Sequence, residues 1–196
     1  MIKTKLFACL AIPAILSVTV PGTARCAGLD ASLSAVGAKA AGGRTFEAFE
    51  EIKRAELELW RSMPGMAARR AVLVEEEPAF FGSYTPKAGG AYRPGEPVYL
   101  YIEPVGYTIR ESGEEFSFSL KADFTLVDGD GQILGGQRDF GRWEMSGRRP
   151  VTEFMMFFTF DFEGLPAGSY TIETLIMDTL SDRTLEVDLP ITIVGE

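Results

Sequence analysis

Residues 116–126 read FSFSLKADFTL, and this stretch decides the fold. Its apolar side chains fall at every second position, while the residues between them are serine, lysine, aspartate and threonine. A period of two is typical of a β-strand that has one face buried and the other in water. The sequence therefore predicts a strand of an antiparallel sheet at this position, packed against a core on one side.

The same period recurs before and after this strand. Further strands are predicted at residues 71–74, 79–81, 97–103, 132–140, 153–162, 170–178 and 184–194. The sequence Asp128-Gly129-Asp130-Gly131 predicts a hairpin turn, because glycine accepts the positive φ that such turns require. With seven or eight short strands and almost no helix after residue 64, the fold class is mainly β. The pattern favours an immunoglobulin-like antiparallel β-sandwich over residues 65–196, with a closed barrel as the alternative.

Three residues suggest how the late strands are arranged. Tyr170 stands at the start of the penultimate strand, where a tyrosine corner would fold its hydroxyl back onto the preceding chain. The next inward position is Ile172, where an antibody domain would carry a cysteine, so packing is expected to replace the disulfide. Pro190 cannot donate to a ladder, which places the last strand at an edge or marks a bulge.

One amphipathic α-helix is predicted before the sandwich, at residues 44–64. Its apolar residues recur at intervals of three and four, with Thr45 as the expected N-cap and Pro64-Gly65 as the end. The apolar stripe, from Phe46 to Trp60, has two interpretations. It covers the core of its own domain, which we favour because a free stripe would be an exposed apolar patch, or it docks in a groove of a partner.

The first 24 residues have the order of a secretory signal peptide. Lys3 and Lys5 precede an apolar core at residues 6–20, and small residues follow up to a cut after Ala24. About 15 apolar residues are fewer than the roughly 20 that span a bilayer, so retention as a membrane helix is the lesser alternative. We therefore expect a periplasmic or secreted product with no integral membrane span after signal removal.

Residues 25–43 are rich in alanine, glycine and serine, and are predicted to form a flexible linker. Cys26 is the only cysteine left after signal removal, so an internal disulfide is excluded. Lipid attachment at Cys26 is an alternative, although Arg25 before it is unfavourable for that signal.

The charge and composition exclude several function classes. The chain has 19 basic and 28 acidic residues, a net charge of −9, which falls to about −11 without Lys3 and Lys5. Nucleic acid is therefore not an expected partner. There is no histidine, which removes the commonest catalytic base and zinc ligand. A calcium loop beginning at Asp128 would need glycine at its sixth position and glutamate at its twelfth, where this chain has Ile133 and Asp139.

We therefore expect no catalytic, metal or cofactor site, and no enzyme. Carboxylates such as Glu103, Asp161 and Asp178 could form an acid–base pair, but the sequence does not show two of them facing each other across a cleft.

The candidate partner or ligand surface consists of aromatic and cationic residues. Trp143 stands among the densest set of cations and could serve as an aromatic platform for an anionic or sugar ligand, although solvated cations that balance nearby acids are the more economical interpretation. Outward aromatics on strands are further platforms, and Trp60 marks the helix. The full set is Trp143, Arg138, Arg142, Arg148, Arg149, Tyr99, Tyr101 and Trp60, with Tyr107 as another platform.

Two functional hypotheses follow. The first is a non-enzymatic periplasmic module that binds an envelope protein through its helix, its loops or an edge strand. The alternative is a module that binds a small molecule or carbohydrate on these aromatics, with no cofactor in either case.

Three short motifs carry a family resemblance. The segment 92–98, YRPGEPV, resembles the opening of macroglobulin-type β-sandwich domains. The turn at 128–131 stands where such domains have a hairpin turn. The residues Gly168-Ser169-Tyr170 stand where such domains begin a late strand. The chain also resembles uncharacterised exported proteins of proteobacteria. The resemblance implies a sandwich module that acts as a spacer or binding surface. It implies no activity, because nothing here matches the thioester and bait segments by which macroglobulins trap proteases.

Overall fold

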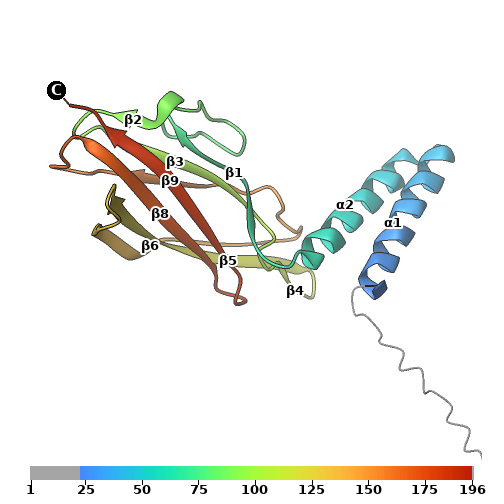
Figure 1. The fold of residues 1–196 in the computed structure, drawn as a ribbon. Coiled ribbons are helices and arrows are strands. Elements are labelled where there is room, and N and C mark those ends of the chain that lie inside the picture. Colours follow the sequence, from blue (N-terminus) through green and yellow to red (C-terminus); the bar gives the residue numbers. More distant parts are fainter. Residues whose placement is uncertain (1–22, 196) are drawn as a thin grey trace, which may run out of the picture.

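The computed structural model describes residues 23–195, so the predicted export signal lies, except for its last two residues, outside the described part of the chain. Two helices come first and a β-sandwich follows (Figure 1). The helices are α1 (Thr23–Ala41) and α2 (Thr45–Ser62), and one turn of 3-10 helix lies at Ala88–Gly90. The strands are β1 (Ala67–Val74), β2 (Ala91–Tyr92), β3 (Val98–Val105), β4 (Arg110–Ser112), β5 (Glu115–Asp128), β6 (Ile133–Gly147), β7 (Met156–Phe160), β8 (Gly168–Asp178) and β9 (Thr184–Ile193).

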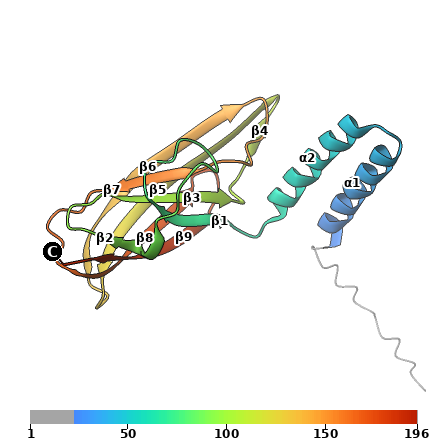
Figure 2. The same cartoon turned by 90° about the horizontal axis from the view of Figure 1, so that it is seen from above.

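The strands form two sheets of unequal size (Figures 1 and 2). The smaller sheet has three antiparallel strands in the order β1-β3-β7. The larger has the order β2-β9-β8-β5-β4, and β6 pairs with the other edge of β5. All its neighbours are antiparallel except β2 and β9. The fold is thus mainly β and compatible with the predicted sandwich.

The strand count differs from the prediction of seven or eight. Over the described residues there are nine, because β2 and β4 have two and three residues, too few to show a period. The predicted strand at 79–81 is wrong, since only an isolated bridge between Phe80 and Ser83 forms there, around Gly82 at φ 76°.

The core lies between the two sheets and is built by the alternation seen in the sequence. On β5, Phe118, Leu120 and Ala122 are buried, as are Leu100 and Ile102 on β3. Buried side chains of β7 and β8 complete the interior. Burial of this apolar surface is the dominant stabilising contribution to the fold.

The predicted tyrosine corner is confirmed. Tyr170 is buried near the start of β8, and its hydroxyl donates to the backbone oxygen of Pro166 at 2.8 Å. Pro190 on β9 pairs with Thr171 of β8, and β2 reaches only Thr192 and Ile193. The other side of Pro190 is therefore a sheet edge, as predicted, and its missing N–H leaves no ladder bond unmade.

The predicted flexible linker at 25–43 is wrong, because α1 occupies most of it. Alanine has the highest helix propensity, and α1 packs antiparallel on α2, where Ala48 and Ala55 are buried. Lys39 pairs with Glu51 across the two helices. The predicted N-cap is also shifted by one residue, since Arg44 caps α2 and no side chain bonds there. No described helix is long and apolar enough to cross a membrane.

The C-terminal end of α2 is fixed on the sandwich. Trp60 is buried beside Tyr107, and Arg61 pairs with Glu111 at 2.8 Å. The guanidinium of Arg183 donates to the backbone oxygens of Met63 and Gly106. The interpretation of the helix as a cover for its own domain is therefore correct for this end. The rest of the hairpin projects away from the sheets (Figures 1 and 2).

Candidate functional site

The four arginines and Trp143 do not assemble into one site. All four arginines are exposed, and among the described residues Arg138 has no ion-pair partner. The other three each pair with a glutamate: Arg142 with Glu144 at 3.4 Å, Arg148 with Glu114, and Arg149 with Glu50 at 3.4 Å. Exposed pairs of this kind contribute little to stability and fit solvated cations that balance nearby acids.

Trp143 is not a platform beside the arginines. It lies opposite Leu120 in the ladder, on the inner face of the sheet, and its ring is 5.2 Å from that of Phe158. Arg142 lies opposite Lys121, on the outer face. Neighbouring residues of a strand point to opposite faces, so the sequence proximity of Trp143 and Arg142 does not bring them together.

The tyrosines predicted as platforms are mostly covered. Tyr107 is fully buried, and so is Tyr101, whose ring lies 4.3 Å from Tyr84 in the segment that covers the small sheet. The Tyr101 hydroxyl accepts from the Gly82 N–H and donates to the carboxylate of Glu103, both at 2.8 Å. Burial, followed by the bond to Glu103, raises the pKa of Tyr101 to about 12. Of the predicted strand platforms, only Tyr99 is partly exposed.

The carboxylates considered for acid–base chemistry have structural partners or are exposed. Asp178 is buried and accepts from the Thr108 and Leu180 N–H groups and from the Ser181 hydroxyl, at 2.6 to 2.9 Å. Asp161 lies exposed after β7. Over residues 23–195 there is no group of three or more side chains that could hold a metal ion.

A groove opens where the edges of the two sheets meet, between β6 and β7. Within residues 23–195, each of these strands pairs on one side only, β6 with β5 and β7 with β3. Phe140 of β6 stacks on Phe160 of β7 with ring centroids 5.4 Å apart, and Phe158 and Phe162 continue the stack. Beyond Phe140 the edges part around a hollow of about 430 Å³. We call this hollow the aromatic groove; it is lined by Phe124, Leu126, Leu134, Gly135, Gly136, Gln137, Phe140, Thr159, Phe160, Asp161, Phe162, Glu163 and Leu165.

Gly135 leaves space in the aromatic groove. It lies opposite Leu126 in the β5–β6 ladder, so a side chain at this position would point inward, yet a Cβ there would meet nothing within 4 Å. As a result Phe124, Phe140 and Phe162 remain partly exposed although they face the interior. The aromatic groove therefore offers a ligand accessible aromatic rings for apolar contact and the free backbone edge of β7 for hydrogen bonding.

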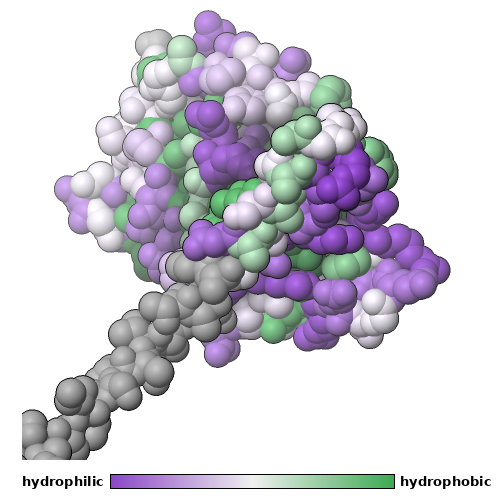
Figure 3. Space-filling view, turned by 90° about the vertical axis from the view of Figure 1, so that its right-hand side faces the viewer, coloured by the Kyte–Doolittle hydropathy of each residue, from purple (hydrophilic) through white to green (hydrophobic). Residues whose placement is uncertain are grey.

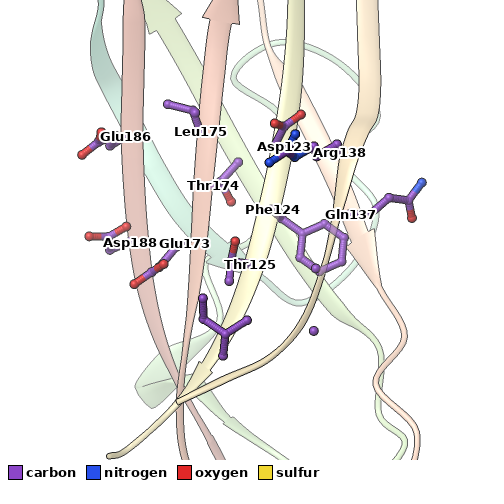
Figure 4. Close-up of a pocket in the computed structure, with 13 residues that line it drawn as sticks. Asp123, Phe124, Thr125, Gln137, Arg138, Glu173, Thr174, Leu175, Glu186 and Asp188 are labelled. Atoms are coloured by element: carbon purple, nitrogen blue, oxygen red, sulfur yellow. The ribbon is translucent and has the colours of Figure 1, made fainter. Parts of the chain in front are cut away.

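The outer face of the large sheet carries a second hollow, of about 610 Å³, over the β5–β6 bulge. Its rim is acidic, with Asp123 on β5, Glu173 on β8, and Glu186 and Asp188 on β9 (Figure 4). Asp123 is partly buried and accepts from the Asp139 N–H at 2.7 Å, and the other three acids are exposed, as is usual for solvated surface.

Sequence reasoning missed the aromatic groove. The predicted strand at residues 153–162 indicates core packing for its alternate side chains, and Phe158 and Phe160 are buried in this way. The available signal was the pair Gly135-Gly136 inside a predicted strand, because glycine in a strand often marks a bulge or a site of close approach.

Comparison with known proteins adds no family. No family model and no curated protein matches the chain. Among solved structures, the sporulation control protein Spo0M of Bacillus subtilis is 12% identical with a TM-score of 0.36, over 68% of this chain and 51% of Spo0M, so this chain spans about half of its length. The superoxide reductase of Ignicoccus hospitalis is 14% identical with a TM-score of 0.33, over 55% of this chain and 76% of the other. The Pseudomonas fluorescens alkylpurine DNA glycosylase AlkC is 8% identical with a TM-score of 0.39, over 83% of this chain and 42% of AlkC. None of these three is described as a macroglobulin-type domain, and the similarity carries no functional argument.

Proposed function

We propose that this protein is a non-enzymatic exported module that binds an extended apolar segment of an envelope protein in the aromatic groove. The observation that carries the proposal is that Phe124, Phe140 and Phe162 face inward yet are accessible, next to the unpaired edge of β7. The segment would add a fourth strand to the small sheet, in the mode of β-strand addition.

The unequal sheets support this mode of binding. Three strands face six, so the β5–β6 part of the large sheet is only partly covered. A strand added beside β7 would place every second side chain over Phe124 and Leu126, in the space that Gly135 leaves open. Its backbone would bond to the free edge of β7, which supplies affinity independent of sequence, while the groove selects apolar side chains.

The rim of the groove suggests the charge of the segment. Asp161 and Glu163 line it, are exposed, and have no ion-pair partner among residues 23–195. A segment with lysine or arginine at its outward positions would complement them, and such pairing mainly raises the association rate and selectivity.

A small apolar or aromatic molecule is the second candidate ligand. A hollow of about 430 Å³ lined by phenylalanine faces is within the size range of ligand sites. The two candidates differ in their need for the β7 edge, since only a peptide uses it.

The test places a photo-crosslinking residue at Gln137, on the groove rim, and as control at Glu186, on the outer face of β9. The proposal expects one envelope protein captured from Gln137 and absent from Glu186, with the crosslink in an extended alternating segment. That segment, made as a synthetic peptide, should bind the wild-type protein by calorimetry. Gly135→Leu, which fills the groove, should abolish binding, and Gly147→Leu at the other end of β6 should not. A peptide that binds both variants equally contradicts the proposal.

A further inference from the structure

One face of the helical hairpin is apolar and uncovered. Four large side chains on the hairpin are exposed by about half: Leu33 on α1 by 54%, and Phe49, Ile52 and Leu59 on α2 by 53%, 48% and 55%. Figure 3 views the hairpin from its outer side and shows hydrophobic residues running across it between strongly hydrophilic ones. We call Leu33, Phe49, Ile52 and Leu59 the hairpin face.

These residues lie on the same side of the hairpin. The helices run antiparallel, with Ser32 next to Glu58 and Lys39 next to Glu51, and α2 buries Ala48 and Ala55 between them. At 3.6 residues per turn, Leu33 then points to one side of this contact, and Ile52 and Leu59 point to the same side. On α2 the apolar positions 49, 52, 59 and 63 also follow the spacing of a heptad seam, with Glu56 at its centre.

We propose that a second copy of this chain covers the hairpin face, so that two hairpins form an antiparallel four-helix bundle. The hairpin is about 27 Å long and about 19 Å wide, which would bury about 500 Å² per copy and about 1,000 Å² in total. This area is at the lower limit for a specific interface, so a dimer in the micromolar range is expected.

The charges on α2 argue against a lipid surface as the cover. Helices that lie on membranes are rich in lysine and arginine on their polar face. In contrast, α2 has five glutamates and three basic residues, and the whole chain has a net charge of −9. α2 therefore lacks the basic polar face that binds anionic lipids, whereas a second hairpin presents the same apolar residues on both sides of Glu56.

An antiparallel register brings complementary shapes together. With a two-fold axis near Glu56, Ile52 of one copy lies opposite Leu59 of the other, and Phe49 lies opposite Met63. Beside Met63, where α2 meets the sandwich, there is a hollow of about 340 Å³ whose lining includes Leu59, Trp60 and Val105 together with the charged Glu56 and Arg69, and its apolar part can receive the Phe49 ring. At the axis each Glu56 is already held by Lys53 at 2.9 Å and Thr152 at 2.8 Å.

This arrangement goes beyond the proposed function and would make it bivalent. The antiparallel bundle places the two sandwiches at opposite ends. The aromatic groove ends at Leu165, near the start of β8 and the C-terminus, on the side of the sandwich away from the hairpin (Figure 1). Both aromatic grooves therefore stay open in the dimer. A partner that presents two or more binding segments would be bound more tightly by the dimer than by one copy.

The test measures molar mass by light scattering from about 1 to 200 µM, on protein expressed from the full chain with its intact mass recorded. We expect the mass to rise to that of two copies. Ile52→Glu and Leu33→Glu should each weaken the dimer by about 100-fold or more, because an unpaired charge is buried. Phe80→Glu, which changes a residue on the sandwich that is even more exposed, should leave the dimer intact. Circular dichroism confirms that each variant is folded.

A second measurement tests the register. With both native cysteines replaced by serine, Glu56→Cys should form a disulfide-linked dimer under mild oxidation, and Glu47→Cys, on another flank of α2, should not. Three results would overturn the proposal: a monomer at 200 µM, a dimer unaffected by Ile52→Glu, or a monomer that co-sediments with phosphatidylethanolamine–phosphatidylglycerol vesicles. None of these results concerns peptide binding in the aromatic groove, so the two proposals can fail separately.

Discussion

The indole N–H of Trp60 donates to the backbone oxygen of Tyr107 at 2.7 Å, and the two rings meet edge to face with centroids 4.9 Å apart. Through this pair the last turn of α2 is fixed to the segment between β3 and β4. Because the contact combines a buried hydrogen bond with aromatic packing, it determines how the hairpin is oriented on the sandwich.

Replacing Trp60 should therefore weaken the attachment of the hairpin to the sandwich. Trp60→Phe keeps most of the packing but leaves the Tyr107 oxygen without its donor, which should lower the free energy of unfolding by about 1–3 kcal/mol. Trp143→Phe is the matched control, since its indole makes no hydrogen bond to any of residues 23–195 and the ring is only partly buried. Urea denaturation followed by circular dichroism measures both. An equal loss in the two variants would contradict the role of the hydrogen bond.

Two buried tyrosines should respond in opposite ways to loss of the hydroxyl. Tyr170→Phe removes the bond to Pro166 and should cost about 1 kcal/mol. The hydroxyl of Tyr92 is buried and has no hydrogen-bond partner in the described part of the chain, so Tyr92→Phe should be neutral or stabilising by up to about 1 kcal/mol. The ring of Tyr92, over which the Lys87 ammonium lies at 4.6 Å, is retained. Melting temperatures of the two variants provide the comparison, and a larger loss for Tyr92→Phe would refute it.

The free energy of unfolding should fall at high pH because the hydroxyls of Tyr92 and Tyr101 are buried. Desolvation raises the pKa of Tyr101 and of Tyr92 to about 12 in the folded protein, above the value of 10 for an exposed tyrosine. Between pH 10 and 12 the unfolded chain loses these protons first, so the unfolded state binds fewer protons and stability decreases as pH rises. Below pH 10 this contribution is fully present. Urea midpoints measured from pH 9 to 12 should decline less steeply in Tyr101→Phe than in the wild type, and equal slopes would contradict the assignment.

The junction between hairpin and sandwich requires glycine at position 106. A Cβ on Gly106 would lie 2.5 Å from the backbone oxygen of Gly65, and its φ is +78°. Gly106→Ala therefore adds a backbone clash to conformational strain and should cost more than about 2 kcal/mol. Gly113→Ala has a similar positive φ of +62° with nothing within 4 Å, and should cost about 1 kcal/mol. Equal denaturant midpoints for the two variants would show that the close approach of position 106 to the Gly65 backbone does not matter for stability.

The sheets could be predicted from the sequence because alternation is a local signal, as in residues 116–126. The tyrosine corner was also local, since Tyr170 and Pro166 are four residues apart. In contrast, the helix α1 was missed because its alanines show no clear apolar period, and it is stabilised by α2, which the sequence places after it. The side-chain environment of Tyr101 depends on Gly82 and Tyr84, in a segment that crosses over β3. Contacts between residues far apart in the sequence leave no periodic pattern, so the burial of Tyr101 could not be predicted from the sequence.

Gly135 provides the last test, because it should separate stability from binding. Replacement by leucine places an apolar side chain in the aromatic groove, where it covers the partly exposed Phe124, and removes a flexible glycine from a strand. Gly135→Leu should therefore raise the melting temperature of the unliganded protein more than Gly147→Leu, which also replaces a strand glycine but lies opposite Phe116, outside the aromatic groove. Binding surfaces commonly keep such uncovered apolar area at the expense of stability. If the groove were only a packing defect, Gly135→Leu would be stabilising and would leave capture of the partner from Gln137 unchanged. Loss of capture together with a gain in stability is the combination expected of a binding site.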